Sequence, residues 1–200
     1  MSAGDCPAGP RCRRQVGNRA PMRPRPWNSS RDAGFTLIEI VVAVGIVGVL
    51  AAIGIPSLLR ARATAHEGSA IASLRAISSA QAAYQAQGGG GGYATALAAL
   101  GRSCPGSSEP FISPDLAVDP TLKGGYQVAL QPAAAATAAA PDCNGTATSS
   151  DYYATAVPIS TIAGQRAFAS NAHGTIFFDP SGVAPTEAAM APGGGATPIH

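Results

Sequence analysis

The stretch GFTLIEIVVAVGIVGVLAAIGIP, residues Gly34–Pro56, decides the fold because almost every residue in it is apolar or small. The apolar run continues to Leu59, and its roughly 25 residues would form a helix about 37 Å long, enough to cross a hydrocarbon core about 30 Å thick. One ionisable residue, Glu39, lies near its start, although a charge at mid-span costs on the order of 2.5–3.5 kcal/mol on insertion scales. The sequence therefore predicts a membrane-spanning helix over 35–59. The carboxylate of Glu39 is costly there, so its presence calls for a functional explanation.

Charge is distributed unevenly on the two sides of this segment. Seven of the 13 Lys and Arg residues precede Gly34, together with two acidic residues, whereas six basic and nine acidic residues follow it. A basic N-terminal arm can bind nucleic acid, but an apolar span follows directly, so we interpret residues 1–34 as a topogenic leader and predict no nucleic-acid partner. By the positive-inside rule, the excess of arginine before the span predicts a single-pass protein with its N-terminus inside and its C-terminus outside. A cleaved secretory signal is the alternative, with only a weak cleavage site in VLAAIGIPSL.

The helical pattern continues beyond the apolar span, because residues 58–87 contain no proline and many good helix formers. An apolar stripe at helical spacing, interrupted by Gln81, runs along this part and consists of Ile71, Leu74, Ile77 and Tyr84. We predict one helix over 35–87, ended by the five glycines at 88–92. Its first half, 35–59, is expected to lie in the membrane and its second half, 60–87, to pack on the rest of the protein.

Small residues and one proline interrupt the apolar half of this helix. Gly48, Gly54 and Pro56 are expected to bend or locally loosen it. Small residues also let neighbouring helices approach closely in a bundle, although lipid-facing filler is the alternative interpretation.

The remaining residues, 88–200, are predicted to form a globular head that contains a β-meander. Alternating apolar residues and turn signals predict four strands, at 124–131, 151–159, 166–172 and 174–179. The low-complexity segment between the first two strands is expected to be irregular, and the tail 191–200 to be loose. The fold class is therefore predicted to be α+β, with a long N-terminal helix packed on a small antiparallel sheet of about four strands.

The cysteines follow from the expected topology. If the chain after the span is exported, Cys104 and Cys143 enter an oxidising compartment, where one disulfide is the expected state. Free thiols are the alternative, and a zinc site is disfavoured because the sequence lacks CxxC spacing and nearby histidines.

The N-terminal segment resembles that of type IV pilins and of the related type II secretion pseudopilins. The resemblance rests on G-F-T-L-I-E at 34–39, followed by an apolar stretch with a glycine mid-span and a proline near its end. It is close over about 30 residues, and the plan of helix, loop and four strands extends it weakly to residue 180. The leader is longer than is usual in this family, and translation from Met22 would give a leader of typical length.

The resemblance implies a sequence of events at named residues. A dedicated prepilin peptidase would cut after Gly34 and remove the cationic leader, and the same enzyme would methylate the new amino group of Phe35. Glu39 would then be the glutamate of the mature subunit that acts in assembly.

The cost of burying a charge suggests what Glu39 does in a fibre. An unpaired carboxylate is costly in a packed apolar fibre core, and the nearest cation would be the amino group of Phe35 in the same subunit or its neighbour. Such an ion pair adds little net stability, but a slipped subunit would leave both charges unpaired, so the pair would set axial register. The alternative is a charge near the interface that reaches the lipid headgroups.

We predict no enzyme, no cofactor and no metal. His66, His173 and His200 are scattered, and no serine or cysteine lies in a nucleophile motif. Asp115 and Asp119 faintly resemble the calcium loops of some pseudopilins, but solvated turn residues are the simpler interpretation. Arg166 and His173 are expected at the surface.

The sequence thus predicts a structural subunit of a pilus-like fibre, held in the inner membrane with its head in the periplasm before assembly. It would end in a cell-surface pilus or a periplasmic pseudopilus. Its expected partners are copies of itself, the prepilin peptidase, an inner-membrane assembly platform and the lipid bilayer. The alternatives are a secretion pseudopilin and an uncleaved single-span protein with a periplasmic binding domain.

Overall fold

A computed structural model describes residues 34–199. The expected leader up to residue 33, with Cys6, Cys12 and the alternative start Met22, lies outside the described residues. The chain divides into two units, Met1–Val44 and Gly45–His200, and each is described by itself. One helix, α1 (Leu37–Gln87, 51 residues), runs through the boundary between them and confirms the helix expected over 35–87 within two residues at its start.

The described part of the first unit is the beginning of α1. Gly34, Phe35 and Thr36 precede the helix, and every residue from 34 to 44 is exposed. The hydroxyl oxygen of Thr36 accepts a hydrogen bond from the Glu39 backbone N–H at 3.3 Å. Thr36 therefore caps the helix, because it satisfies one of the four amide groups that a helix start leaves without a partner.

In the second unit, α1 changes its surroundings along its length. Residues 52–62 are all exposed, and Glu67 is the first buried residue. The helix continues without a break through Gly48, Gly54 and Pro56. A Cβ atom placed on either glycine would meet nothing within 4 Å, so both positions leave room for another helix.

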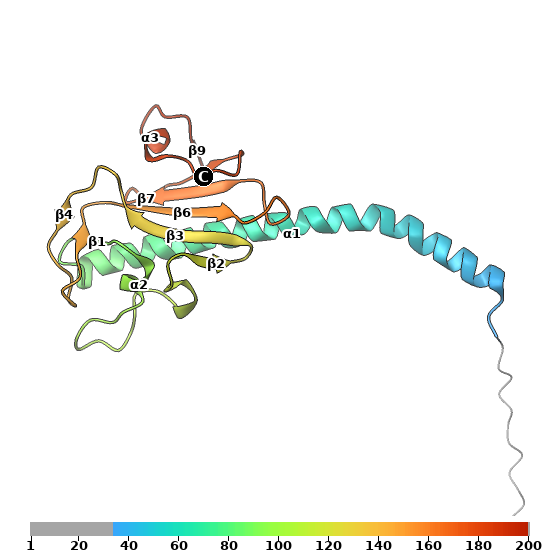
Figure 1. Ribbon diagram of the computed structural model, residues 1–200, viewed down its shortest axis with the longest axis horizontal. Coiled ribbons are helices and arrows are strands. Elements are labelled where there is room, and N and C mark those ends of the chain that lie inside the picture. Colours follow the sequence, from blue (N-terminus) through green and yellow to red (C-terminus); the bar gives the residue numbers. More distant parts are fainter. Residues whose placement is uncertain (1–33, 200) are drawn as a thin grey trace, which may run out of the picture. The chain divides into compact units, whose positions relative to one another are not determined.

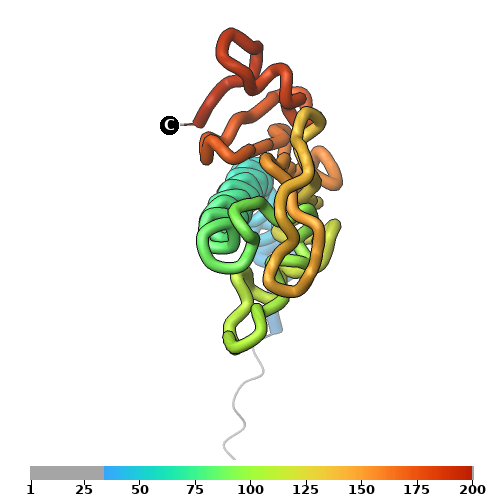
Figure 2. Tube along the Cα trace, turned by 90° about the vertical axis from the view of Figure 1, so that its left-hand side faces the viewer, coloured from blue at the N-terminus to red at the C-terminus, as the bar shows by residue number. Residues whose placement is uncertain are grey.

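The last part of α1 packs against a six-stranded antiparallel sheet in the order β2-β3-β6-β7-β8-β9 (Figure 1). In sequence order these strands are β2 (Thr121–Lys123), β3 (Tyr126–Pro132), β6 (Tyr152–Pro158), β7 (Ala167–Asn171), β8 (Ile176–Asp179) and β9 (Thr197–Pro198). Figure 2, viewed from the side, shows the helix and the sheet as neighbouring layers. The α+β class and the four expected strands are confirmed as β3, β6, β7 and β8.

The sheet has two more strands than expected, one at each edge. β2 pairs with β3 over only three residues, and β9 pairs Thr197 with Phe178 within a glycine- and proline-rich tail. Strands this short have no visible alternation in sequence, and their neighbours in space hold them in place. The expectation of a loose tail was therefore wrong at β9.

The low-complexity segment also contains structure that the sequence does not reveal. A second antiparallel sheet has the order β1-β5-β4, with β1 at Tyr93–Ala94, β5 at Thr148–Ser149 and β4 at Ala138–Ala139. Three short helices complete the head: α2 (Leu97–Leu100), the 3-10 helix η1 (Pro114–Leu116) and α3 (Glu187–Met190). Residues 132–150 are thus not wholly irregular, since two two-residue strands lie within them.

The main core lies between α1 and the six-stranded sheet. Leu74, Ile77 and Tyr84 of the expected stripe are buried there, and Ile71 is half-buried against them. They meet aromatic and apolar side chains of the sheet, among them Tyr126, Val128, Tyr152 and Phe168. The stripe is therefore the helix face that holds the head together.

Gln81 belongs to this core although the sequence suggests an interruption. It is fully buried, its side-chain N–H₂ donates to the Ala94 carbonyl at 2.9 Å, and its side-chain oxygen accepts from the Ala94 N–H at 2.8 Å. The amide thus acts as a strand partner for β1, because it satisfies both backbone groups of one strand residue.

A disulfide joins Cys104 and Cys143, with 5.5 Å between their Cα atoms, beside the C-terminal end of α1. The Cys143 N–H donates to the Gly88 carbonyl at 2.7 Å, and a Cβ atom on Gly88 would come 2.6 Å from the Cys104 sulfur. The bond therefore fits tightly against the point where the helix ends, and only glycine fits there.

Removal of this disulfide is expected to destabilise the head without changing its fold. The closed loop contains 38 intervening residues, for which the chain-entropy model gives about 3–4 kcal/mol. A Cys104→Ala/Cys143→Ala protein should lose that amount of unfolding free energy in a denaturant titration monitored by near-UV circular dichroism. Ser107→Ala, on the same exposed loop, is the control, and equal midpoints for the oxidised and cysteine-free proteins would contradict the prediction.

Candidate functional site

The candidate site begins where the apolar helix begins. Phe35 precedes α1 with 76% of its surface exposed, and Glu39 lies in the first turn of the helix. Among residues 34–199, neither of the two ion pairs includes Glu39. A carboxylate in the first turn suits the partial positive charge of a helix N-terminus, and it is available to a cation from outside the described residues.

Apolar side chains leave this part of the helix without a partner in either unit. Fifteen large apolar side chains between positions 35 and 59 are 49–82% exposed. Residues 34–44 are the described part of the first unit, and in the second unit residues 52–59 are exposed without exception. A helix that is apolar all round lies in a membrane or among other helices, so the segment needs one of these environments throughout its existence.

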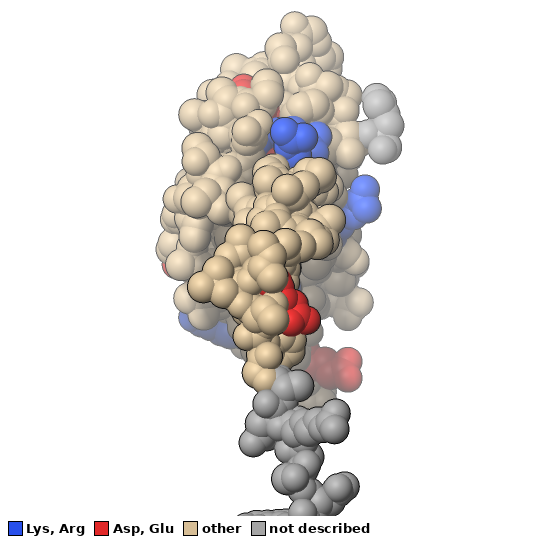
Figure 3. Space-filling model, turned by 90° about the vertical axis from the view of Figure 1, so that its right-hand side faces the viewer, with Lys and Arg blue, Asp and Glu red and all other residues tan. Residues whose placement is uncertain are grey.

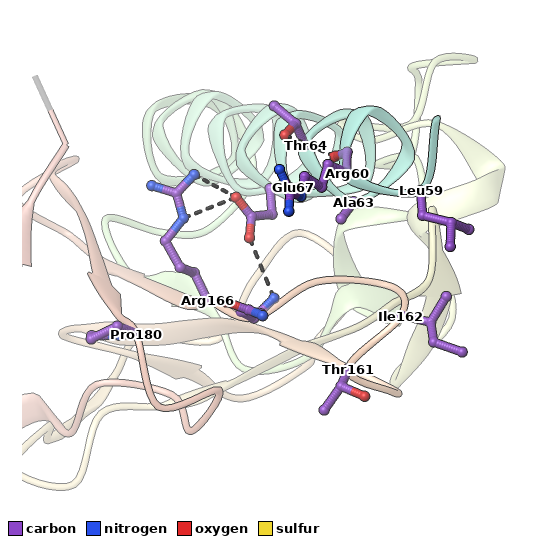
Figure 4. A pocket seen from close by; sticks show the side chains of 10 residues that line it. Leu59, Arg60, Ala63, Thr64, Glu67, Thr161, Ile162, Arg166 and Pro180 are labelled. Carbon is purple, nitrogen blue, oxygen red and sulfur yellow. Dashed lines mark hydrogen bonds and ion pairs between the residues drawn. The ribbon is translucent and has the colours of Figure 1, made fainter. Parts of the chain in front are cut away.

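A hydrogen-bonded ion pair joins the second half of α1 to Arg166, the residue just before β7, and the sequence did not reveal it (Figure 4). The Arg166 guanidinium donates twice to one carboxylate oxygen of Glu67, and the Gln165 N–H donates to the other at 3.4 Å. The Arg166 side chain is 41% exposed and that of Glu67 only 11%. Arg166 thus lies at the surface as expected, but its ion pair was not foreseen, because the partner lies 99 positions away in the sequence.

Two opposing effects act on the pKa of the Glu67 carboxyl. Burial disfavours the charged form, but the hydrogen bonds from Arg166 and Gln165 and the charge of Arg166 outweigh it, so the pKa is lowered from its usual 4.5. The charged form is thus the one that the fold stabilises.

This shift predicts a pH dependence of stability. A carboxyl with a lowered pKa in the folded protein contributes stability above about pH 4.5, its unfolded value, and loses it as the pH falls through the folded value. The unfolding free energy should therefore drop below pH 4.5, and less steeply in Glu67→Gln, which should also lose roughly 1 kcal/mol at neutral pH. Glu109→Gln, on an exposed loop, controls for the loss of one negative charge. Parallel pH profiles for wild type and Glu67→Gln would contradict the prediction.

The acidic residues of the proline-rich loop do not converge on a common site. Asp115 forms an ion pair with Lys123, whereas Asp119 accepts hydrogen bonds from the Leu97 and Leu130 backbone N–H groups. Within residues 34–199, no three acidic, histidine or cysteine side chains lie close enough together to hold a metal ion. These carboxylates serve as local partners for lysine and backbone.

Comparison with known proteins finds a family model that matches the N-terminal segment. Residues 29–55 match the model of the prokaryotic N-terminal methylation motif. In this segment the chain is similar to the type IV pilin family. The match includes Gly34, Phe35 and Glu39, and the apolar run up to Ile55.

The chain is also similar to a type IV pilin, over a longer segment than the family model covers. The chain is 41% identical over 54 residues to the type IV major pilin protein PilA of Myxococcus xanthus (strain DK1622). The aligned part covers 27% of this pilin-like chain and 24% of that protein. No solved structure matches the chain, so the head is described from its own coordinates.

The expected site residues thus fall into two groups. Gly34, Phe35 and Glu39 lie together at the start of α1, whereas Cys104 and Cys143 are joined in the head of the second unit. Gly48, Gly54 and Pro56 lie between them along the exposed helix, where their role in flexibility stays a prediction. The Glu67–Arg166 pair, like the buried Gln81 described above, is a polar feature that sequence reasoning missed.

Proposed function

We propose that this pilin-like protein is the structural subunit of a type IV pilus-like fibre. In this proposal the prepilin peptidase cuts after Gly34 and methylates the amino group of Phe35. The mature chain then starts with its apolar helix, while residues 88–200 form the head. One observation carries the proposal: the segment 35–59 is almost entirely exposed and apolar on all sides, and its single carboxylate, Glu39, lies four residues after Phe35, the expected first residue of the mature chain.

The chemistry of the segment supports each step of this proposal. Gly34 has no side chain and precedes the helix in exposed backbone, so a peptidase could reach the Gly34–Phe35 bond. Cleavage would remove seven arginines that hold the N-terminus inside the cell. The subunit could then leave the bilayer, and the apolar surface that lipid covered would be covered by the helices of neighbouring subunits.

The proposed localisation has two stages. Before assembly, the chain is a single-pass inner-membrane protein with its N-terminus inside and its head in the periplasm. After assembly, it lies in a fibre, built by an inner-membrane assembly platform, with copies of itself as its neighbours. The Cys104–Cys143 disulfide supports an oxidising compartment for the head.

Mass spectrometry of the N-terminus of the membrane-resident protein tests the proposal. The expected chain begins with N-methyl-Phe35 and is absent from cells that lack the prepilin peptidase. A membrane-resident protein that keeps its leader would support the uncleaved single-span alternative and rule out the fibre subunit.

A pilus subunit and a secretion pseudopilin differ in where the fibre ends. We favour the pilus because Asp115 pairs with Lys123 and Asp119 accepts from a backbone N–H, so the two acids that faintly resemble a pseudopilin calcium loop already have partners. Mature protein in the fibres sheared from the cell surface is the expected result. Mature protein confined to the periplasmic side of the envelope would favour the pseudopilus.

A further inference from the structure

The loop between β6 and β7 presents two isoleucines to the outside. Ile159 is 58% and Ile162 75% exposed. The loop itself is held firmly: the Ile159 N–H donates to the Gly125 carbonyl at 3.1 Å, and the Ala163 N–H donates to the Ser160 carbonyl at 3.0 Å. A fixed loop that exposes two large apolar side chains provides an apolar contact surface.

A groove of about 610 Å³ brings this loop to the place where the apolar part of α1 ends. Leu59, the last residue of the apolar run, and Ile162 lie at one end of the groove, and the Glu67–Arg166 pair lies at the other (Figure 4). Arg60, the first charged residue after Glu39, also lines it. The exposed loop and the end of the apolar helix are therefore neighbours within the same unit.

The length of the uncharged helix segment indicates how far from the bilayer centre Leu59 and the neighbouring β6–β7 loop lie. Twenty residues without a charge separate Glu39 from Arg60, and as a helix they cover about 30 Å, the thickness of the hydrocarbon core. Arg60 and Arg62 are exposed, and such cations at a helix end reach the lipid headgroups. Ile162, beside Leu59, thus lies at the level of the headgroups when α1 spans the membrane.

The charges around the groove fit a phospholipid surface. Glu67 and Arg166 neutralise each other and leave Arg60 as the surplus positive charge among the lining residues. Charged side chains are few and scattered on the face of the molecule shown in Figure 3. A positive side chain next to apolar ones suits the phosphate and upper acyl region of a lipid leaflet.

We infer that the β6–β7 loop docks on the outer leaflet before assembly, with Ile159 and Ile162 inserted among the phospholipid headgroups. The loop is then a second membrane contact besides α1, and it fixes the tilt of the head over the bilayer. This inference rests on the proposed function only in that α1 spans the membrane.

Depth-dependent fluorescence quenching tests the docking in the full chain, reconstituted into vesicles of phosphatidylethanolamine and phosphatidylglycerol. A bimane label is attached at Thr161→Cys, in a background with Cys6→Ser and Cys12→Ser so that no other free thiol reacts. Two sets of nitroxide lipids act as quenchers: one is labelled near the headgroup, for the label at Thr161, and the other deep in the acyl chain, for the label at Val47 in the middle of the span. Labels at Val47→Cys, inside the apolar helix, and at Ser107→Cys serve as positive and negative controls.

The negative control lies far from the expected membrane surface. Ser107 and Gln87 line the same pocket, and Gln87 is 28 residues beyond Leu59, about 42 Å along the helix. Docking predicts strong quenching of the labels at Thr161 and Val47 and none at Ser107, independent of the ratio of protein to lipid.

Variants of Ile159 and Ile162 measure how much each side chain contributes to docking. Ile159→Ser and Ile162→Ser should each lower the ratio of docked to undocked loop, measured with the Thr161 label, by up to about tenfold. Because both side chains are exposed, the head should keep its fold, which circular dichroism checks. Val118→Ser, a change of the same kind at a 62% exposed site outside the groove, should leave the quenching unchanged.

Three outcomes would overturn the docking. Equal quenching at Thr161 and Ser107, with Val47 quenched, refutes the loop contact and leaves the membrane-spanning helix intact. Quenching at Thr161 that appears only when many copies share a vesicle assigns the loop to a neighbouring subunit instead of lipid. Absence of quenching at Val47 refutes the proposed function and the docking together.

Discussion

Replacement of Glu39 by alanine is expected to leave processing intact and to remove the protein from the fibre. In the variant, the amino group of Phe35 would enter the fibre core without its partner. Loss of one member of a buried ion pair costs about 3–5 kcal/mol, which corresponds to roughly a hundredfold or more in an equilibrium constant. We expect mature Glu39→Ala protein to accumulate in the membrane, while its amount in the sheared-surface fraction falls by a factor of that order.

Three companion variants separate charge from shape in this experiment. Glu39→Gln keeps the size of the side chain but not its charge, and it should fail like alanine. Glu39→Asp keeps the charge on a shorter side chain and should retain part of the assembly. Val42→Ala, which removes apolar surface from the same exposed helix, should assemble far better than Glu39→Ala. Normal processing together with wild-type incorporation of Glu39→Ala would refute the assembly role.

Replacement of Gln81 by leucine is expected to destabilise the packing of α1 on the head strongly. Leucine matches the apolar stripe around it, so a sequence pattern would favour the substitution. In the structure, however, it would leave the Ala94 N–H and C=O without the hydrogen bonds that Gln81 supplies. Each unsatisfied buried group costs about 1–3 kcal/mol, so the loss should be about 2–6 kcal/mol of a total near 5–15 kcal/mol.

A denaturant titration of the detergent-solubilised chain measures this loss, with the near-UV signal of the buried tyrosines as the probe. Gln87→Leu is the matched control, because it makes the same chemical change at an exposed position of the same helix. It should shift the midpoint little. An unfolding free energy for Gln81→Leu within 0.5 kcal/mol of wild type, about the size of an ordinary surface effect, would show that Ala94 finds other partners.

The parts of the fold that the sequence predicted are those with a local cause. The long helix follows from its composition and from the glycines after Gln87, and β3, β6, β7 and β8 follow from alternation and turns. The short strands β1, β2, β4, β5 and β9 have no such local signal, because each is two or three residues long and depends on its neighbour in space. Gln81 was misjudged for the same reason: its partner, Ala94, lies across a turn that the helix pattern does not contain.

The residues of the candidate site also differ in whether a local sequence signal could predict them. Glu39 stood out in sequence because a carboxylate in an apolar run is costly, so its local surroundings alone made it conspicuous. Glu67 and Arg166 are ordinary charged residues in their own segments, and only the packing of α1 on the sheet brings Glu67 next to the end of the β6–β7 loop. The cysteine pair was predictable in part. The expected oxidising compartment predicted a disulfide, but only the structure shows that it lies beside the end of α1.

The position of the first buried residue has a consequence for how the chain could be reused. Nothing before Glu67 belongs to the buried core, so residues 35–59 act as an exchangeable module that the head does not need in order to fold. Grafting a different apolar span of equal length onto Arg60 should alter membrane retention and fibre compatibility, while the head keeps its thermal stability. Anchor and head are thus free to change independently, with the short segment 60–66, in which no residue is fully buried, as the joint between them.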